Sequence, residues 1–265
     1  MLPNAFLSFD LFGKTFSFHM YGLMIGIGVL LCFVVLFTYA KKLGYDPAFI
    51  DFVFYNGIAS IIGGFASAAL FQAFYNYLAH PELGFHIGQG LTFIGGALGG
   101  AVIFLAVYFI FRKKYKKTRL ADVISLIPCC IFIAHGFGRI GCFFAGCCYG
   151  KVTHSFLGVK FPYLSEPVYP TQLYEAAFLF IMFGVCSYLL LKKNFRHNLS
   201  VWLISYGIFR FFIEFLRGDA RGSFIPGLSP SQFWSIIMVV LGVGCYFLLR
   251  EIYRRQDAQK TNENP

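Results

Sequence analysis

The chain has 265 residues, of which 58% are hydrophobic, 20% aromatic and only 13% charged. A soluble globular domain carries about a quarter charged residues, so this composition excludes a soluble enzyme and indicates an integral membrane protein. The net charge of +10 does not point to a nucleic-acid partner, because the basic residues fall in short clusters between apolar runs.

Apolar stretches of membrane-spanning length follow a short amphipathic arm, residues 1–16, which we expect to lie on the membrane surface. At about 20 residues a span, the predicted spans are residues 16–39, 49–74, 92–111, 120–141, 171–191, 199–216 and 232–249. Residues 250–265 form a basic, cytoplasmic tail. The predicted fold is therefore an all-α bundle of about seven transmembrane helices in a single polytopic membrane domain, residues 1–265.

The basic clusters predict the orientation of the spans. They follow every second span, at Lys41, Lys42, 112–119, Lys192, Lys193, Arg196 and the tail. The positive-inside rule then places the N-terminus outside and the C-terminus in the cytoplasm. Residues 135–150 and 217–231 would lie near the outer leaflet.

The end of the fourth predicted span, His135 to Gly150, carries an arginine, three thiols and several glycines. An unpaired arginine in hydrocarbon costs roughly 2.5–3.5 kcal/mol, so we expect Arg139 to lie beside an anionic residue or ligand. Glycine allows close backbone approach and can end a helix inside the protein. We interpret this stretch as the wall of a polar cavity.

The sixth predicted span carries Arg210, Glu214 and Arg217, whose spacing places them on one helix face. They could form a purely structural salt-bridge network. However, these arginines and Arg139 exceed the carboxylates of Glu214 and Glu175, and arginine suits bidentate binding of phosphate. The surplus of positive charge predicts a site for a phospholipid phosphate.

Other polar residues lie at the ends of predicted spans. Gln172 and Glu175 are one turn apart at the start of the fifth span, where Glu175 could balance an arginine or orient a substrate. His135 precedes Arg139 by one turn and is either an intramembrane base or a hydrogen-bonded core histidine. Tyr21, at the start of the first span, is either an interfacial anchor or a substrate contact.

Cys142, Cys147 and Cys148 could form a thiolate metal site together with Cys129, Cys130 and His135. The spacing is not that of a CxxC pair, and adjacent cysteines suit a tetrahedral site poorly. We therefore expect no metal and no cofactor. A redox role or an acyl-acceptor role for these thiols remains open.

Short motifs occur in a fixed order along much of the chain: residues 19–24, 93–96, 138–150, 169–175, 210–222 and 228–232. Together they resemble the prolipoprotein diacylglyceryl transferases, bacterial enzymes that lipidate lipoprotein precursors. The resemblance implies that phosphatidylglycerol is bound from the membrane. A lipobox cysteine on an incoming signal-peptide helix would attack the glyceryl carbon, forming a thioether and releasing glycerol phosphate.

The resemblance also implies roles and a location. Arg139 and Arg210 would hold the phosphate, Glu214 would orient Arg210, and Tyr21 would hydrogen-bond the head group. The expected catalytic residues are Arg139, Arg210, Glu214 and His135, and the expected substrate-binding residues are Tyr21, Gly95, Gly96, Cys142, Gly150, Gln172, Glu175 and Arg217. The protein would lie in the bacterial cytoplasmic (inner) membrane. Its partners would be phosphatidylglycerol, the prolipoprotein signal-peptide helix and membrane lipids, with no nucleic acid.

The sequence also departs from the family pattern. Cys142 stands where the family commonly has asparagine, Cys147 where it has an acidic residue, and Ile94 where it has histidine or tyrosine. The family's arginine in the second span is also missing. Either His135 or His19 then serves as the base, or the chain is a paralogue that transfers a lipid fragment to another acceptor through a cysteine. A non-catalytic lipid-binding or transport protein is the alternative of another class, although no internal repeat typical of transporters is evident.

Overall fold

The structure is a computed structural model that describes residues 7–11, 14–88, 90, 92–115, 118, 120–218 and 227–263. The chain divides into two compact units, one made of Met1–Lys42 with Leu120–Pro265 and the other of Leu43–Arg119. Each unit is described by itself. Whether they form a single membrane domain stays a prediction.

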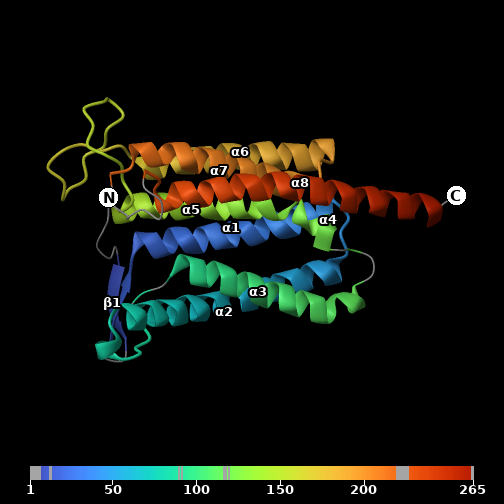
Figure 1. The fold of residues 1–265 in the computed structure, drawn as a ribbon, viewed down its shortest axis with the longest axis horizontal. Helices are drawn as coiled ribbons and strands as arrows, with labels where there is room; N and C mark the ends of the chain where they lie inside the picture. Colours follow the sequence, from blue (N-terminus) through green and yellow to red (C-terminus); the bar gives the residue numbers. More distant parts are fainter. Residues whose placement is uncertain are drawn as a thin grey trace. The chain divides into compact units, whose positions relative to one another are not determined.

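The larger unit begins with an antiparallel hairpin of β1 (Leu7–Leu11) and β2 (Lys14–Phe18). Its helices are α1 (Met20–Lys42), α4 (Leu120–Ile124), α5 (Ile127–Ala145), α6 (Thr171–Lys193), α7 (Asn198–Ile213) and α8 (Pro230–Glu263). The short 3-10 helix η3 (Glu214–Leu216) continues α7. α1 packs against α5, α5 against α6, and α7 against α8 (Figure 1).

The run predicted as one span from residue 120 is interrupted. α4 ends at Ile124 and α5 begins at Ile127. Pro128 lies in the first turn of α5 and has no N–H to donate to the carbonyl of residue 124. α5 ends at Ala145 and is capped by Gly146, whose φ of 71° is the left-handed conformation that glycine adopts without steric cost.

Six helices of the described chain are long and apolar enough to cross a membrane: α1, α2, α5, α6, α7 extended by η3, and α8. The prediction of an all-α, multi-pass membrane bundle is therefore confirmed, with the β1–β2 hairpin as a small non-helical addition. A further apolar helix of 19 residues, α3, lies in the other unit. The exact number of spans and the position of the N-terminal arm on the membrane stay predictions.

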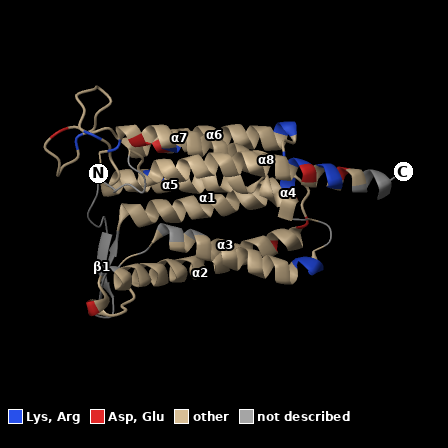
Figure 2. Cartoon of the chain, in the orientation of Figure 1, with Lys and Arg blue, Asp and Glu red and all other residues tan. Residues whose placement is uncertain are grey.

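The basic clusters that end α1, α6 and α8 of the larger unit lie at one end (Figure 2), although the loop at the other end also carries Lys151 and Lys160. Lys41 and Lys42 end α1, Lys192 and Lys193 end α6, and the basic part of α8 continues from the same end. The loop of residues 146–170, which joins α5 to α6, lies at the opposite end. This separation is the pattern that the positive-inside rule requires of a spanning bundle.

The smaller unit consists mainly of two long helices, α2 (Pro47–Ala79) and α3 (Phe93–Phe111), with the short 3-10 helices η1 (Pro81–Leu83) and η2 (Arg112–Lys114). Small residues allow α2 and α3 to pack closely. A Cβ atom on Gly64 would lie 3.0 Å from the Gly96 carbonyl, and one on Gly100 would lie 3.1 Å from the Ser60 carbonyl. Ser67 Oγ donates a hydrogen bond of 2.9 Å to the carbonyl of Gly95.

The contact between α1 and α5 generates a test of packing in the larger unit. A Cβ on Gly28 would lie 2.9 Å from the Ala134 carbonyl, whereas one on Gly26 would meet nothing within 4 Å. We expect Gly28→Ala to destabilise the protein by about 1–3 kcal/mol because the two backbones must move apart. Gly26→Ala, the matched control, should leave the melting temperature in detergent unchanged or slightly raised. Equal melting temperatures for the two variants would contradict the close α1–α5 contact.

Candidate active site

The first polar cluster of the larger unit is centred on Glu175, which is buried near the start of α6. Its Oε1 lies 2.9 Å from Arg139 Nη2 on α5 and 3.6 Å from His135 Nε2. The Tyr206 hydroxyl on α7 donates a hydrogen bond of 2.7 Å to the same oxygen. Glu175 is 1% exposed, so its charge is stabilised almost entirely by these neighbours.

Glu214, just after α7, gathers the second cluster. Its Oε2 lies 2.9 Å from Arg210 Nη2 and 3.9 Å from Arg217 Nε. The Ser229 hydroxyl donates a 3.0 Å hydrogen bond to Oε1, and Arg210 Nη2 donates a 2.9 Å hydrogen bond to Ser231 Oγ. The structure thus brings together the three charged residues that the helical spacing placed on one face.

The serines of the second cluster are positioned by the start of α8. The Gln232 N–H donates to Ser229 Oγ at 3.2 Å, and the Ser229 N–H donates to Gln232 Oε1 at 3.1 Å. This is a reciprocal capping box, and Pro230 occupies the first helical position, where its missing N–H costs nothing. The sequence motif of residues 228–232 did not by itself indicate roles for Ser229 and Ser231, nor did any motif indicate one for Tyr206.

The two clusters leave positive charge and hydrogen-bond donors unmet. Among the described residues, three arginines face two carboxylates, which is a surplus of one positive charge. Arg139 Nε and Arg210 Nη1 are buried and have no hydrogen-bond partner among the described residues. A buried donor without a partner costs about 1–3 kcal/mol, so an anionic group with several oxygens would be stabilised here.

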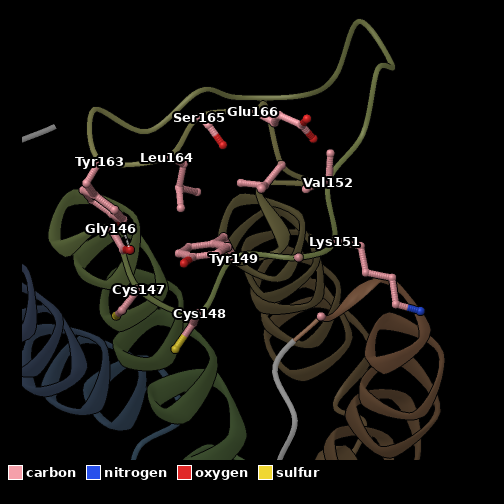
Figure 3. Close-up of a pocket in the computed structure, with 13 residues that line it drawn as sticks. Gly146, Cys147, Cys148, Tyr149, Lys151, Val152, Tyr163, Leu164, Ser165 and Glu166 are labelled. Carbon is pink, nitrogen blue, oxygen red and sulfur yellow. Dashed lines mark hydrogen bonds between the residues drawn. The ribbon is translucent and has the colours of Figure 1, made fainter.

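A cavity of about 580 Å³ lies under the loop that follows α5. It is lined by residues 146–152, 163–166, Val168 and Gly218 (Figure 3). Tyr163, from the later part of this loop, donates a hydrogen bond to the carbonyl of Gly146 at the start of the loop (Figure 3). Neither of the carboxylates Glu175 and Glu214 lines the cavity.

Gly150 lies where this loop crosses the end of α7. Its N–H donates to the Tyr169 carbonyl at 2.8 Å, and it forms an isolated β-bridge with Arg217. A Cβ at this position would lie 2.5 Å from the Leu216 carbonyl. Close backbone packing therefore accounts for glycine here without any substrate.

The end of α5 and the loop bring three thiols together. The Sγ atoms of Cys142, Cys147 and Cys148 all lie within 4.8 Å of one another. Two buried side chains at the start of α6 hold the loop in place. Gln172 Nε2 donates to the Cys147 carbonyl at 2.7 Å, and Thr171 Oγ1 donates to the Cys148 carbonyl at 2.8 Å. Gln172, predicted to bind substrate, thus positions the thiols.

The surroundings make the thiols unequal acids. Hydrogen bonds with Cys142 and Cys147, and the Arg217 guanidinium, lower the pKa of the Cys148 thiol far below its usual value, although partial burial opposes this. Hydrogen bonds with Cys142 and Cys148 raise the pKa of the Cys147 thiol. Cys148 is therefore the first of the loop thiols to ionise.

The remaining predicted site residues are placed as follows. Tyr21, at the start of α1, packs against α5, where a Cβ on Gly141 would lie 3.2 Å from its ring. Gly95 and Gly96 lie in the smaller unit, at the α2–α3 contact already described. The side chain of Ile94 lies outside the described residues.

The lowered pKa of Cys148 predicts an unusual order of alkylation. At about pH 6, well below the ordinary thiol pKa of about 8.5, iodoacetamide should modify Cys148 before Cys147, although Cys147 is more exposed. Peptide mapping by mass spectrometry measures this order. Arg217→Gln should raise the pH at which Cys148 reacts, because its guanidinium no longer stabilises the thiolate. Preferential labelling of Cys147 at that pH would contradict the assignment.

Comparisons with known proteins agree with the resemblance of the motifs. The family model described as prolipoprotein diacylglyceryl transferase matches residues 8–248. The phosphatidylglycerol–prolipoprotein diacylglyceryl transferase of Clostridium tetani (strain Massachusetts / E88) is 35% identical over 257 residues, which cover 94% of this chain and 98% of the relative. A second such transferase, from Clostridium perfringens (strain 13 / Type A), is 33% identical, with 95% and 98% covered. The chain therefore belongs to the prolipoprotein diacylglyceryl transferase family.

Proposed function

We propose that the protein transfers a diacylglyceryl group from phosphatidylglycerol to the lipobox cysteine thiol of prolipoproteins. The observation that carries this proposal is the pair of buried, unmet donors on Arg139 and Arg210 beside a surplus positive charge. An anionic lipid phosphate supplies both the charge and the acceptor oxygens that these groups lack. The names of the relatives support the same donor and acceptor.

Arg139 and Arg210 would act on the leaving group. When the thiolate attacks the glyceryl carbon, a C–S bond forms, the C–O bond to phosphate breaks, and negative charge accumulates on the departing glycerol phosphate. Guanidinium groups already aimed at that phosphate stabilise the charge in the transition state more than in the bound lipid. Glu175 and Glu214 hold the two guanidinium groups in place before the lipid arrives.

The acceptor thiol must lose its proton before it attacks. His135 is our proposed proton acceptor, because its Nε2 lies 3.6 Å from Glu175 and its ring packs edge-on against Tyr206. The carboxylate would stabilise the imidazolium that forms. The acceptor would arrive as a signal-peptide helix from the surrounding lipid.

We further propose that the protein lies in the bacterial cytoplasmic membrane with its N-terminus outside. The basic end of the larger unit would then face the cytoplasm, and the loop that carries the thiols would face outward. This orientation gives the site access to a lipoprotein precursor that has crossed the membrane. The positive-inside rule supports it.

The decisive experiment adds purified protein to phosphatidylglycerol vesicles and a synthetic lipobox peptide, and follows peptide mass and released glycerol phosphate. We expect the peptide to gain one diacylglyceryl group. Arg139→Lys and Arg210→Lys keep the charge but lose the planar fork of donors, and each should lower kcat by about 10²–10³-fold. Arg254→Lys, on the exposed part of α8, is the matched control and should retain full activity.

Lysine is preferred to alanine here, because removing one partner of a buried ion pair costs about 3–5 kcal/mol and can unfold the protein. Melting temperatures of all the variants show whether they are folded. A folded wild-type protein that produces no peptide mass gain would exclude the transfer. Lipid covalently attached to Cys142, Cys147 or Cys148 in that case would favour the alternative of a cysteine-linked paralogue.

Tyr206 provides a separate test of how the first cluster is positioned. Its hydroxyl donates to the oxygen of Glu175 that also contacts Arg139. A hydrogen bond to a charged group contributes about 1.5–3 kcal/mol, so we expect Tyr206→Phe to lower kcat by about 10- to 100-fold. The KM for phosphatidylglycerol should change much less, since both guanidinium groups remain. Tyr188→Phe, an exposed tyrosine on α6, serves as the control, and an unchanged kcat in Tyr206→Phe would refute the positioning role.

A further inference from the structure

The three thiols at the end of α5 form a group that the transfer mechanism above does not use. Cys142, Cys147 and Cys148 present sulfur atoms that lie within 4.8 Å of one another. In a site where a divalent metal ion is bound by thiolates at about 2.3 Å, the sulfur atoms lie about 4 Å apart. The observed grouping therefore needs only a small inward movement to hold one ion.

The backbone removes the objection raised by the adjacent cysteines. Side chains of neighbouring residues in an extended chain point to opposite faces. Here Cys148 has a φ of 64°, which bends the chain so that its thiol lies on the same side as that of Cys147. Figure 3 shows these two side chains next to each other on the chain that leaves α5.

The fold holds this arrangement rigidly. The carbonyls of Cys147 and Cys148 accept hydrogen bonds from Gln172 and Thr171, which are each 1% exposed. Cys142 is fixed by α5 itself, one turn beyond Arg139. Cys147 and Cys148 lie on a loop held by hydrogen bonds, and Cys142 lies on α5, so the three ligands are preorganised. Thiols on mobile surface segments would first have to be ordered when the ion binds.

Cationic side chains lie beside the thiols. Arg217 interacts with Cys148, and Arg139 interacts electrostatically with Cys142. Three thiolates around a divalent ion carry a net charge of −1, which the neighbouring arginines balance. Cys147 is exposed, so an ion can reach the group from solvent.

We propose that Cys142, Cys147 and Cys148 bind one thiophilic divalent cation of the Zn²⁺ class through three thiolates. Three protein ligands leave the fourth tetrahedral position open, as in catalytic zinc sites. If the proposed transfer function holds, the fourth ligand is the acceptor cysteine of the lipobox peptide. The ion would then favour the thiolate form of the acceptor, whose proton His135 accepts, in a chain where Ile94 replaces the family's histidine or tyrosine.

The step balances without an oxidant or reductant. The acceptor thiol loses its proton to His135 as its sulfur enters the fourth position, because a coordinating thiol is deprotonated outright. The bound thiolate attacks the glyceryl carbon, the carbon–oxygen bond to phosphate breaks, and glycerol phosphate leaves with the electron pair of that bond. The product is a neutral thioether, which is a weaker ligand than a thiolate and departs from the ion.

Cobalt binding tests the site itself. Purified protein in detergent, with its thiols reduced, is mixed with one equivalent of Co²⁺, and thiolate-to-cobalt charge-transfer absorption is recorded. A parallel sample is loaded with Zn²⁺, desalted and analysed for metal content. We expect one ion per chain, and loss of both signals in Cys142→Ser, Cys147→Ser and Cys148→Ser.

The controls separate this site from the other thiols. Cys245→Ser, on α8 and outside the group, should bind metal as the wild type does. Equal metal content in the wild type and in the variant that lacks all three thiols would overturn the proposal. Melting temperatures identify any variant that fails to fold, and a Cys142→Ala, Cys147→Ala, Cys148→Ala variant then replaces the serine series.

A second measurement tests the role in transfer. A lipobox peptide added to the cobalt-loaded protein should raise the intensity of the charge-transfer band, since a fourth sulfur enters, whereas the same peptide with serine in place of its cysteine should not. If the ion binds but the thiol peptide changes nothing, the activation role is wrong and the metal site stands. The peptide mass assay decides the transfer reaction independently, because it requires no cobalt.

Discussion

Arginine can be buried among apolar helices only if something compensates its charge, and this requirement organises the larger unit. Glu175 and Glu214 supply the compensation, each from the entrance or exit of a different helix. Neither carboxylate would be tolerated at 1% or 9% exposure without its arginine. The Arg139–Glu175 pair therefore joins α5 to α6, and the Tyr206 hydrogen bond to Glu175 joins α7 to both. The compensation among the described residues is incomplete, and the remaining positive charge and unmet donors are the basis of the proposed phosphate site.

The loop after α5 also contains polar groups that need hydrogen-bond partners. Its carbonyls at Cys147 and Cys148 lie close to apolar helices and would be costly without partners. Thr171 and Gln172, at the first turn of α6, satisfy them. The same two residues thereby set the position of the thiols. A change in how the start of α6 packs would therefore also move the thiols of the loop.

The sequence predicts the helical architecture and much of the polar site, because both follow from local patterns. Apolar runs define the helices, and the helical spacing predicted that Arg210, Glu214 and Arg217 lie together. They do so although α7 ends at Ile213 and Arg217 follows the 3-10 helix in an extended conformation. Pairing between Arg139 and Glu175 depends on how α5 packs on α6, and the sequence could only offer it as one of two alternatives. The break before α5 was missed, although Pro128 was its signal.

Other features required tertiary structure. Tyr206 reaches Glu175 from a helix that is distant in sequence, so no spacing rule indicates it. The grouping of the three sulfurs depends on the left-handed conformation of Cys148. Non-glycine residues seldom adopt this conformation, so it could not be predicted from the sequence. With an ordinary extended backbone at Cys148, the adjacent thiols would point to opposite sides.

The length of α8 has a consequence for the precision of the site. With 34 residues, the helix is about 51 Å long, while the hydrocarbon layer of a bilayer is about 30 Å thick. Its far end is clamped, because Tyr253 donates to the carbonyls of Ala121 and Arg196, and Asp257 pairs with the Arg196 side chain. A rod that is held at that end cannot slide along α7. The alignment of Ser231 with Arg210 on one side of the membrane is thus maintained by an anchor on the other.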